Sequence, residues 1–307
     1  MKKIRVGVIG LGNLGKSCIE ILQERASQFE LIAIFTRSGQ VEGTLPTSRV
    51  DEFVGKIDVM LVCVGSSADA PLLVPELASK FNTVDSFDTH AKLPEYIESI
   101  RAKQNSTVAV VGTGWDPGIF SLMRIYFDAF SGREDSQTFW GKGVSLGHSN
   151  AIRKIEGVVD AIQFTVPKTE AIKSVRAGEM VEARHKHKRV CYVVANEKEQ
   201  SRIEQEIRTM PNYFEGQEVE VNFVSAKEFG RRFKGRVEHG GLVVSGDSRT
   251  QMEFRLKLKS NPHYTACAMV AYTIAVARLA DEEKIGVYTV ADIAPRYLAC
   301  EDFIKKV

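Results

Sequence analysis

Three glycines near the start of the chain constrain its fold more than any other feature. They stand in Gly10-Leu11-Gly12-Asn13-Leu14-Gly15, directly after the β-branched run Ile4–Ile9 and before the helical stretch Leu14–Glu24. In a G-x-G-x-x-G turn the first glycine makes the bend, the second admits a pyrophosphate to the backbone, and the third lets helix and strand pack closely. The spacing therefore predicts a dinucleotide-binding unit; the alternative is a plain glycine turn between a strand and a helix.

The first 118 residues continue with short β-branched runs and helical stretches in strict alternation. Such alternation is typical of a parallel sheet with helices on both faces. The predicted strands are Ile4–Ile9, Leu31–Phe35, Asp58–Val64, Thr83–Asp85 and Val108–Val111, and the predicted helices are Leu14–Glu24, Ala70–Lys80 and Leu93–Lys103. We therefore expect an α/β chain whose residues 1–118 form a Rossmann domain, a doubly wound parallel sheet.

The pattern changes after Trp115-Asp116-Pro117-Gly118. A helix is predicted over Ile119–Phe130, and one further helix, Glu199–Thr209, interrupts β-rich segments at Ala161–Val166, Arg189–Val194, Val219–Phe223 and Gln251–Leu258. Residues 119–261 are thus predicted to form a second, α+β domain on a mixed or antiparallel sheet. Residues 262–307, helical from Tyr264, are expected to pack back onto the first domain.

Composition narrows the possible partners. The net charge of +2 is not concentrated in either half, which argues against a nucleic acid. The stretch from Tyr264 to Ala280 is too short and too polar to span a bilayer, so no membrane partner is expected. Five scattered cysteines form no CxxC pair, so neither a metal site nor a disulfide is predicted, and a reducing cytoplasm fits best.

The end of the second strand indicates which dinucleotide is bound. An NAD enzyme usually has an acidic residue there for the ribose 2′-hydroxyl. Here the run is Phe35-Thr36-Arg37-Ser38. Arg37 suits a 2′-phosphate, and Thr36 and Ser38 can donate to it. We therefore predict NADP as the cofactor; the alternative is a surface arginine at a strand end.

Ligands of open α/β sheets bind beyond the carboxyl ends of the strands. The residues expected there, beside the glycine turn, to face the nicotinamide and the substrate are Gly65, Ser66, Ser67, Ser86, Phe87, Asp88, Thr113, Gly114, Trp115, Asp116 and Pro117.

Taken together with later segments, these residues resemble one family, the meso-diaminopimelate dehydrogenases. The matching segments run in order over nearly the whole chain: residues 9–15, Phe35-Thr36-Arg37, Thr113-Gly114-Trp115-Asp116-Pro117-Gly118, Phe139-Trp140-Gly141, Gly147-His148-Ser149, His187-Lys188-Arg189, Arg208-Thr209-Met210-Pro211, residues 219–223 and His239-Gly240-Gly241. The glycine turn is common to many families, whereas Gly-Trp-Asp-Pro-Gly and Arg-Thr-Met-Pro are more particular. One departure is Ser38, where many relatives carry a second arginine, which puts the margin of NADP over NAD in doubt.

The resemblance implies a homodimeric enzyme that uses NADP. It implies oxidation of the D centre of meso-2,6-diaminopimelate to L-2-amino-6-oxopimelate, which cyclises to tetrahydrodipicolinate, with release of ammonium; the reverse reaction serves lysine biosynthesis. Carried over by position, the implied substrate contacts are Asp88, Trp115, Asp116, Trp140, Thr165, Arg189, His239 and Asn261, with His148 added from its own motif.

The chemistry of a double zwitterion suits this set. Asp88 and Asp116 fit the reacting amine, whereas Arg189 can grip a carboxylate with two parallel hydrogen bonds. We expect the two domains to supply complementary halves of the site. The predicted catalytic residues are Asp88, Asp116 and Trp115; either aspartate is a candidate base, and His148 stands behind them.

Plainer roles are open for several of these residues. Asp116 can begin a turn, Asn261 can cap a helix before Pro262, Trp140 can be core, and His239 can be a loop residue. The basic run Arg184–Arg189 can be largely a solvated face.

Two other functions share the first domain. A homoserine or semialdehyde dehydrogenase would not need two carboxylates at the strand ends. A catalytically silent NADP-binding regulator would have no evident use for them.

Overall fold

A seven-stranded parallel sheet is the centre of the first of two units. The computed structural model describes residues 2–233, 235 and 238–299. The chain divides into a first unit, Met1–Leu122 with Pro262–Val307, and a second unit, Met123–Asn261. The breaks lie at 122/123 and 261/262, against the predicted 118/119 and 261/262.

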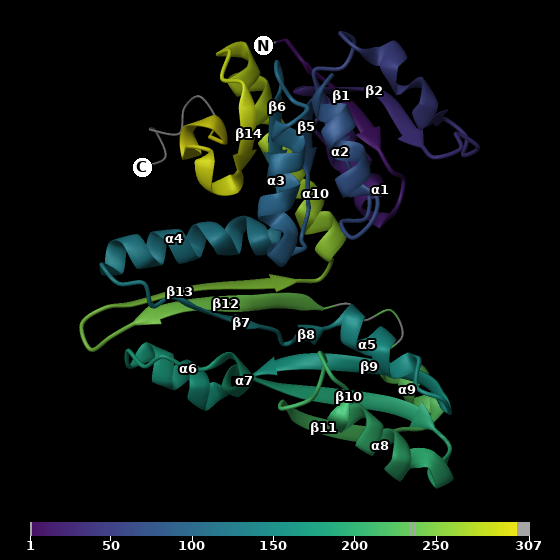
Figure 1. The fold of residues 1–307 in the computed structure, drawn as a ribbon, viewed down its shortest axis with the longest axis vertical. Coiled ribbons are helices and arrows are strands. Elements are labelled where there is room, and N and C mark those ends of the chain that lie inside the picture. Colours follow the sequence, from purple (N-terminus) through teal and green to yellow (C-terminus); the bar gives the residue numbers. More distant parts are fainter. Residues whose placement is uncertain (1, 234, 236–237, 300–307) are drawn as a thin grey trace. The chain divides into compact units, whose positions relative to one another are not determined.

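The sheet of the first unit has the order β14-β6-β5-β4-β1-β2-β3, and all its neighbouring strands are parallel (Figure 1). Its strands are β1 (Ile4–Ile9), β2 (Phe29–Thr36), β3 (Leu45–Pro46), β4 (Val59–Val62), β5 (Asn82–Asp85), β6 (Val108–Val111) and β14 (Gly286–Thr289). The order reverses at β1, which has β2 on one side and β4 on the other. This reversal confirms the predicted doubly wound sheet and places the glycine turn at the switch point.

Helices cover both faces of this sheet because successive strand residues point to opposite sides. Leu61 packs in the apolar cluster that includes α1 (Asn13–Glu24) and α10 (Asn261–Asp281). Its neighbours Met60 and Val62 pack in the cluster that includes α2 (Ala70–Ala78) and α3 (Leu93–Arg101). The two clusters are the two halves of the core.

The C-terminal segment joins this sheet. The predicted helix after residue 264 is present as α10, but the helical assignment is wrong for Gly286–Thr289, which forms β14. In Figure 1 this yellow strand lies beside β6, with Gly286 opposite Val108 and Thr289 opposite Val111. Four residues carry too short a pattern to indicate a strand; the pairing with β6 creates it.

The second unit holds two sheets. The first, in the order β11-β10-β9-β8, is mixed, because β10 pairs antiparallel with β9 and parallel with β11. The second, β13-β12-β7, is antiparallel. The strands are β7 (Gln137–Trp140), β8 (Gly143–Val144), β9 (Val158–Pro167), β10 (His187–Ala195), β11 (Glu218–Phe223), β12 (His239–Gly246) and β13 (Gln251–Leu258). A mixed or antiparallel sheet was expected, and the unit has one of each.

The helices of the second unit are more numerous than predicted. The predicted helices over 119–130 and 199–209 correspond to α4 (Phe120–Ser131) and α8 (Gln200–Thr209). The expectation that one helix interrupts the β-rich part is wrong, since that part also contains α5 (Leu146–Arg153), α6 (Thr169–Arg176), α7 (Ala183–Lys186) and α9 (Ala226–Phe233). Such short helices depend on tertiary packing; in α9 it comes from buried Phe229 and Phe233, one turn apart.

Two further observations concern the described residues alone. None of their helices has the length and apolar character that crossing a membrane requires. Their four cysteines, Cys18, Cys63, Cys191 and Cys267, are free thiols, and Cys300 lies outside the described ranges.

Candidate active site

The glycine turn leaves an open approach at the start of α1. Gly10 has φ +93°, and a Cβ there would lie 2.4 Å from the carbonyl oxygen of Cys63. A Cβ on Gly15 would lie 1.9 Å from the carbonyl oxygen of Gly10, whereas nothing lies within 4 Å of one on Gly12. The turn is therefore tightly packed on its inner side and open at Gly12, where Asn13 is also exposed. This arrangement fits a pyrophosphate at the helix N-terminus.

A cavity of about 450 Å³ adjoins the turn. It is lined by Ile9, Gly10, Leu11, Phe35, Thr36, Arg37, Thr47, Val64, Asp69, Leu72 and Leu73. The Arg37 side chain is 90% exposed, and its Nη2 lies 3.2 Å from Oδ1 of Asp69. This arginine is free to turn toward a phosphate, but Asp69 competes for it. Asp69 was not among the predicted cofactor-binding residues, because its pairing with Arg37 joins positions 32 residues apart.

The two hydroxyls flanking Arg37 are engaged in the local turn. Thr36 Oγ1 accepts a hydrogen bond from the backbone N–H of Gly39 at 3.0 Å, and Ser38 Oγ accepts one from Gln40 at 3.4 Å. These contacts shape the loop that carries Arg37. Leu14, the remaining residue of the glycine motif, is half-buried against the apolar cluster around α1.

The buried side chain of Asp85 connects the loops that follow the neighbouring strands β5 and β6. Its buried carboxylate accepts hydrogen bonds from Phe87 N–H at 2.9 Å, Gly112 N–H at 3.2 Å and the Tyr96 hydroxyl at 2.8 Å. Burial raises the pKa of Asp85 to about 6, although the backbone N–H groups favour its charged form. Asp85 was not among the predicted site residues; its place as the last residue of a predicted strand was the available signal.

The remaining predicted residues of these loops differ in exposure. Gly65, Ser67 and Asp88 are exposed, while Ser66, whose Oγ accepts from the Asp88 N–H at 3.3 Å, and Ser86 are half-buried. Phe87 is buried and stacks on Tyr96 at 4.1 Å between ring centroids, so its ring belongs to the core. Thr113, Gly114 and Pro117 are buried, and the Thr113 hydroxyl donates to the Asp85 carbonyl oxygen at 2.7 Å.

Trp115 and Asp116 lie in an irregular helical turn, Trp115–Ile119, directly before α4. The Asp116 side chain is 4% exposed, and its Oδ1 lies 4.0 Å from Nε2 of His90. Trp115 is half-buried, with its ring edge-on to Phe120 at 5.3 Å. The Asp116 carboxylate is thus enclosed beside an imidazole, whereas the Asp88 side chain is open to solvent.

In the second unit, Arg189 and Thr165 form a pair on adjacent strands. They are directly opposite in the β9–β10 register, and Arg189 Nη1 donates to Thr165 Oγ1 at 2.6 Å. Arg189 is half-buried, and its buried Nε has no hydrogen-bond partner within the described residues. Burial lowers its pKa. A guanidinium stays protonated in proteins, so Arg189 is cationic at neutral pH.

His148 is held at both ring nitrogens. Its Nδ1 lies 2.8 Å from Ser145 Oγ, and its Nε2 lies 3.1 Å from the Tyr213 carbonyl oxygen. Burial, followed by the positive charge of Arg189, lowers the pKa of His148 to about 4. A neutral imidazole with both nitrogens engaged does not suit the role of general base.

Trp140 contacts His187 through both its backbone and its ring. Its backbone N–H donates to His187 Nε2 at 2.8 Å, and the two rings stack at 5.7 Å. The Trp140 side chain is 43% exposed, so it is not simple core. Within the basic run, Arg184 and His185 are exposed as a solvated face would be, but His187 is 2% exposed.

Two predicted residues begin secondary-structure elements. His239 is the first residue of β12, and its pKa is lowered by burial. Asn261 is the first residue within α10, whereas an N-cap residue precedes the first helical residue.

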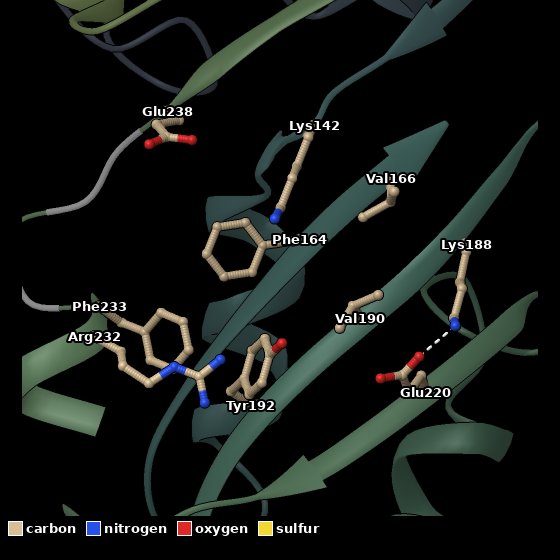
Figure 2. A pocket seen from close by; sticks show the side chains of 10 residues that line it. All are labelled: Lys142, Phe164, Val166, Lys188, Val190, Tyr192, Glu220, Arg232, Phe233 and Glu238. Carbon is tan, nitrogen blue, oxygen red and sulfur yellow. Dashed lines mark ion pairs between the residues drawn. The ribbon is translucent and has the colours of Figure 1, made fainter. Parts of the chain in front are cut away.

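A second cavity, of about 530 Å³, lies on the opposite face of the β9–β10 sheet from Thr165 and Arg189. Because side chains alternate along a strand, Phe164, Val190 and Tyr192 point to this other face. Figure 2 shows them with Lys142, Lys188, Glu220, Arg232 and Glu238 around the rim. None of the predicted substrate contacts lines it. Among the described residues, no group of three or more His, Cys, Asp or Glu side chains is arranged to hold a metal.

Comparison with known proteins identifies the family. Residues 114–260 match the model of the diaminopimelic acid dehydrogenase C-terminal domain. Over 97% of its length the chain is 44% identical to the meso-diaminopimelate D-dehydrogenase of Acetivibrio thermocellus, and it covers 95% of that protein. The chain belongs to the meso-diaminopimelate D-dehydrogenase family. The resemblance drawn from the motifs is thereby confirmed.

Solved structures agree with this assignment. Diaminopimelate dehydrogenase of Corynebacterium glutamicum, in complex with diaminopimelate, has a TM-score of 0.85 at 36% identity, with 99% of this chain and 98% of that chain covered. An engineered D-amino acid dehydrogenase bound to NADP+ has a TM-score of 0.80 at 36% identity, with 99% of both chains covered. The family's fold, a Rossmann unit with a second α+β unit, is therefore the fold of this chain.

Proposed function

We propose that this protein catalyses the reversible, NADP-dependent oxidative deamination of meso-2,6-diaminopimelate at its D centre. The products are L-2-amino-6-oxopimelate, which cyclises to tetrahydrodipicolinate, and ammonium; the reverse direction serves lysine biosynthesis. The observation that carries the proposal is the 44% identity to a meso-diaminopimelate D-dehydrogenase across both units. A homoserine dehydrogenase or a silent regulator does not account for it.

The residues around the glycine turn fit NADP. Open space at Gly12 suits the pyrophosphate, and exposed Arg37 suits the 2′-phosphate. When bound, the cofactor supplies the nicotinamide ring that accepts hydride from the α-carbon of the substrate. Asp85 connects the adjoining loops by accepting hydrogen bonds from Phe87 and Gly112 at the edge on which the nicotinamide is proposed to lie.

Proton handling is assigned to the two aspartates of the first unit. The substrate ammonium must lose a proton before its carbon can be oxidised, and a carboxylate within reach can take it. Asp116, enclosed beside His90, and Asp88, exposed after β5, are the candidates. Trp115 is proposed to limit bulk water there, while a single water hydrolyses the imine and releases ammonium.

The distal carboxylate of the substrate is assigned to Arg189 and Thr165. The pair presents a cation and a hydroxyl on one sheet face, and the buried Arg189 Nε has no acceptor among the described residues. Trp140, His148, His239 and Asn261 complete the proposed contacts, with His148 as a neutral hydrogen-bonding group. The second unit, 123–261, is thus proposed to be the substrate-binding and dimerisation unit, and the first the cofactor-binding unit.

The protein is further proposed to be a cytoplasmic homodimer. Two-fold contacts bring the same patch of both subunits together, so a patch with both charges on an apolar floor complements itself. The cavity in Figure 2 has this character: apolar Phe164, Val190 and Tyr192 lie between cationic and anionic groups, including the ion pair of Lys188 and Glu220. We assign the dimer contact to this face.

The decisive experiment follows NADPH absorbance with each stereoisomer of diaminopimelate. The meso isomer with NADP should be turned over, and the LL isomer, which lacks a D centre, should not. The reverse reaction should require ammonium. Comparable turnover of the LL isomer, or stoichiometric NADP binding without any turnover, would contradict the proposed function.

A further inference from the structure

Gln163 is a buried glutamine beside the Arg189–Thr165 pair. It lies two residues before Thr165 on β9, so the two side chains point to the same face of the sheet. It is 0% exposed, and its Nε2 donates to Thr165 Oγ1 over a long 3.4 Å. Its Oε1 is buried and has no partner among the described residues. Buried amides are normally bonded at both ends, whereas the only side-chain bond of Gln163 among the described residues is the one to Thr165.

The backbone of Gln163 is fixed from both sides. Its N–H donates to Ser149 Oγ at 2.9 Å, and its carbonyl oxygen accepts from Ser145 N–H at 3.0 Å. These two backbone hydrogen bonds therefore fix the position from which the Gln163 side chain reaches Thr165.

Thr165 receives two donors. Arg189 Nη1 donates to its oxygen at 2.6 Å, and Gln163 Nε2 donates to the same oxygen. A hydroxyl has two lone pairs and one hydrogen. Because both lone pairs of the Thr165 oxygen face donors, its hydrogen points away from Arg189 and Gln163. It is directed toward an acceptor other than these two residues.

The hydrogen-bonding capacity of Arg189 is also not fully used. Its buried Nε is without a partner among the described residues. The neighbouring His148 offers no counter-charge to Arg189: its ring is neutral, because burial, followed by the positive charge of Arg189, lowers its pKa to about 4. Unused donors on a buried cation are what a carboxylate-binding site presents before its ligand arrives.

We propose that Gln163 is a positioning residue for substrate binding. By donating to Thr165, it turns the Thr165 hydroxyl into a donor, so that Thr165 and Arg189 grip the same substrate carboxylate. This inference rests on the proposed function, because it takes Arg189 and Thr165 as the contacts of the distal carboxylate of diaminopimelate.

Gln137 is a matched control in the same unit. It is 3% exposed, and both ends of its amide bond the backbone: Nε2 donates to the Glu179 carbonyl oxygen at 3.0 Å, and Oε1 accepts from Val181 N–H at 3.2 Å. Its bonds only connect segments of the fold.

The first test compares Gln163→Met with Gln137→Met. Gln163→Met should raise the KM for diaminopimelate about tenfold, with kcat within threefold and the KM for NADP within twofold of the unmutated enzyme. Gln137→Met should lower the melting temperature and leave that KM unchanged. A Gln163→Met enzyme that is destabilised but has an unchanged KM would show that Gln163 is merely structural.

A double-mutant cycle tests whether Gln163 acts through Thr165. Thr165→Val removes the hydroxyl whose direction Gln163 controls. Adding Gln163→Met to Thr165→Val should therefore raise KM by less than twofold more. Independent, multiplying effects of the two substitutions would overturn the proposal.

Gln163→Glu serves if the methionine variant does not fold, because it keeps the shape of the side chain. At pH 8 its carboxylate would accept from Thr165 and pair with Arg189, so KM should rise at least about 100-fold. Acidification should reverse much of this loss relative to the unmutated enzyme, since a protonated glutamate again donates to Thr165. An unchanged KM at pH 8 would refute the assignment.

The activity of the unmutated enzyme distinguishes a failure of the proposed function from a failure of the proposed role of Gln163. If this enzyme does not turn over meso-diaminopimelate, the proposed function itself fails. If it does, and the Gln163→Met and Gln137→Met enzymes have the same KM for diaminopimelate, only the proposed role of Gln163 fails.

Discussion

Arg189 is the residue on which the proposed substrate site depends most. It is half-buried on β10 and bonded to Thr165, whereas Arg184, in the same basic run, is exposed and paired with Glu182. Replacing Arg189 by alanine should cost about 2–5 kcal/mol in kcat/KM for diaminopimelate, because a buried carboxylate would lose its cationic partner. Steady-state kinetics should show at least about a 30-fold loss.

Arg184→Ala is the control for Arg189→Ala and should stay within about threefold of the unmutated enzyme, since exposed ion pairs contribute little. Arg189→Lys should recover only part of the loss, because a point charge does not reproduce the bidentate fork. If the two alanine variants behave alike, Arg189 does not bind the substrate.

Arg37 and Asp69 together should set the preference for NADP. An arginine–phosphate hydrogen bond contributes about 1.5–3 kcal/mol, so Arg37→Ala should remove a 10- to 150-fold advantage of NADP over NAD. Asp69→Asn should act in the opposite direction and improve NADP binding by up to about fivefold, because it releases Arg37 from an exposed pair.

Both cofactor effects are read from kcat/KM with NADP and NAD. Asp51→Asn, which removes a comparable exposed pair with Lys80, is the control and should leave the preference unchanged. Equal use of NADP and NAD by the unmutated enzyme would remove the basis for both expectations.

At the scale of elements, two glycines of the β1–α1 turn allow cofactor binding and fold stability to be tested separately. Gly12→Ala adds a methyl group to open space, so the melting temperature should change by less than about 2 °C, while NADP affinity should fall at least about tenfold by obstruction of the pyrophosphate. Gly15→Ala would drive a methyl group into the Gly10 carbonyl and should lower the melting temperature by several degrees.

Thermal unfolding and NADP titration measure the two glycine effects separately. A Gly12→Ala protein that binds NADP normally would place the pyrophosphate elsewhere.

The contact between β7 and β10 should be sensitive to acid. His187 is neutral in the folded protein, where burial and then Arg189 lower its pKa to about 4, and its Nε2 accepts from Trp140 N–H. A base with a depressed pKa stabilises the fold above its unfolded pKa of about 6.5, and this contribution is lost as the pH falls toward 4. The loss should amount to about 2–3 kcal/mol at pH 4.

Urea unfolding between pH 7 and pH 4 tests this dependence. His187→Gln keeps a hydrogen-bond acceptor without a proton to gain, so its stability should fall less steeply with acid than that of the unmutated protein. His185→Gln, at an exposed position nearby, should follow the unmutated protein. Identical pH slopes for all three proteins would mean that His187 does not titrate in this range.

At the scale of the whole molecule, a charge placed in the proposed dimer contact tests how two copies assemble. If the face shown in Figure 2 is the dimer contact, Val190→Glu should produce monomers, because the contact would have to remove water from a charge on the apolar floor. Val159→Glu is the matched control, since Val159 is 75% exposed on the adjacent strand β9. Sedimentation should find dimers for the unmutated and control proteins; a dimeric, folded Val190→Glu protein would place the contact elsewhere.

Local patterns determined the first unit almost entirely. The glycine turn, the alternation of short runs and the missing acid after β2 are each contained within a few residues, so the doubly wound sheet and its cofactor edge were predictable. The particular motif around Trp115 and Asp116 likewise indicated the family. These signals survive in sequence because backbone conformation and strand periodicity are set by neighbours along the chain.

Tertiary structure decided the features that join distant segments. The strand β14 exists through its pairing with β6, and the short helices of the second unit exist through the cores they cover. The competition of Asp69 for Arg37 and the neutral state of His148 depend on side chains brought together across many residues. The unpartnered Oε1 of Gln163 and Nε of Arg189 are of the same kind, because a polar group is bonded or left without a partner only once the surrounding chain has buried it.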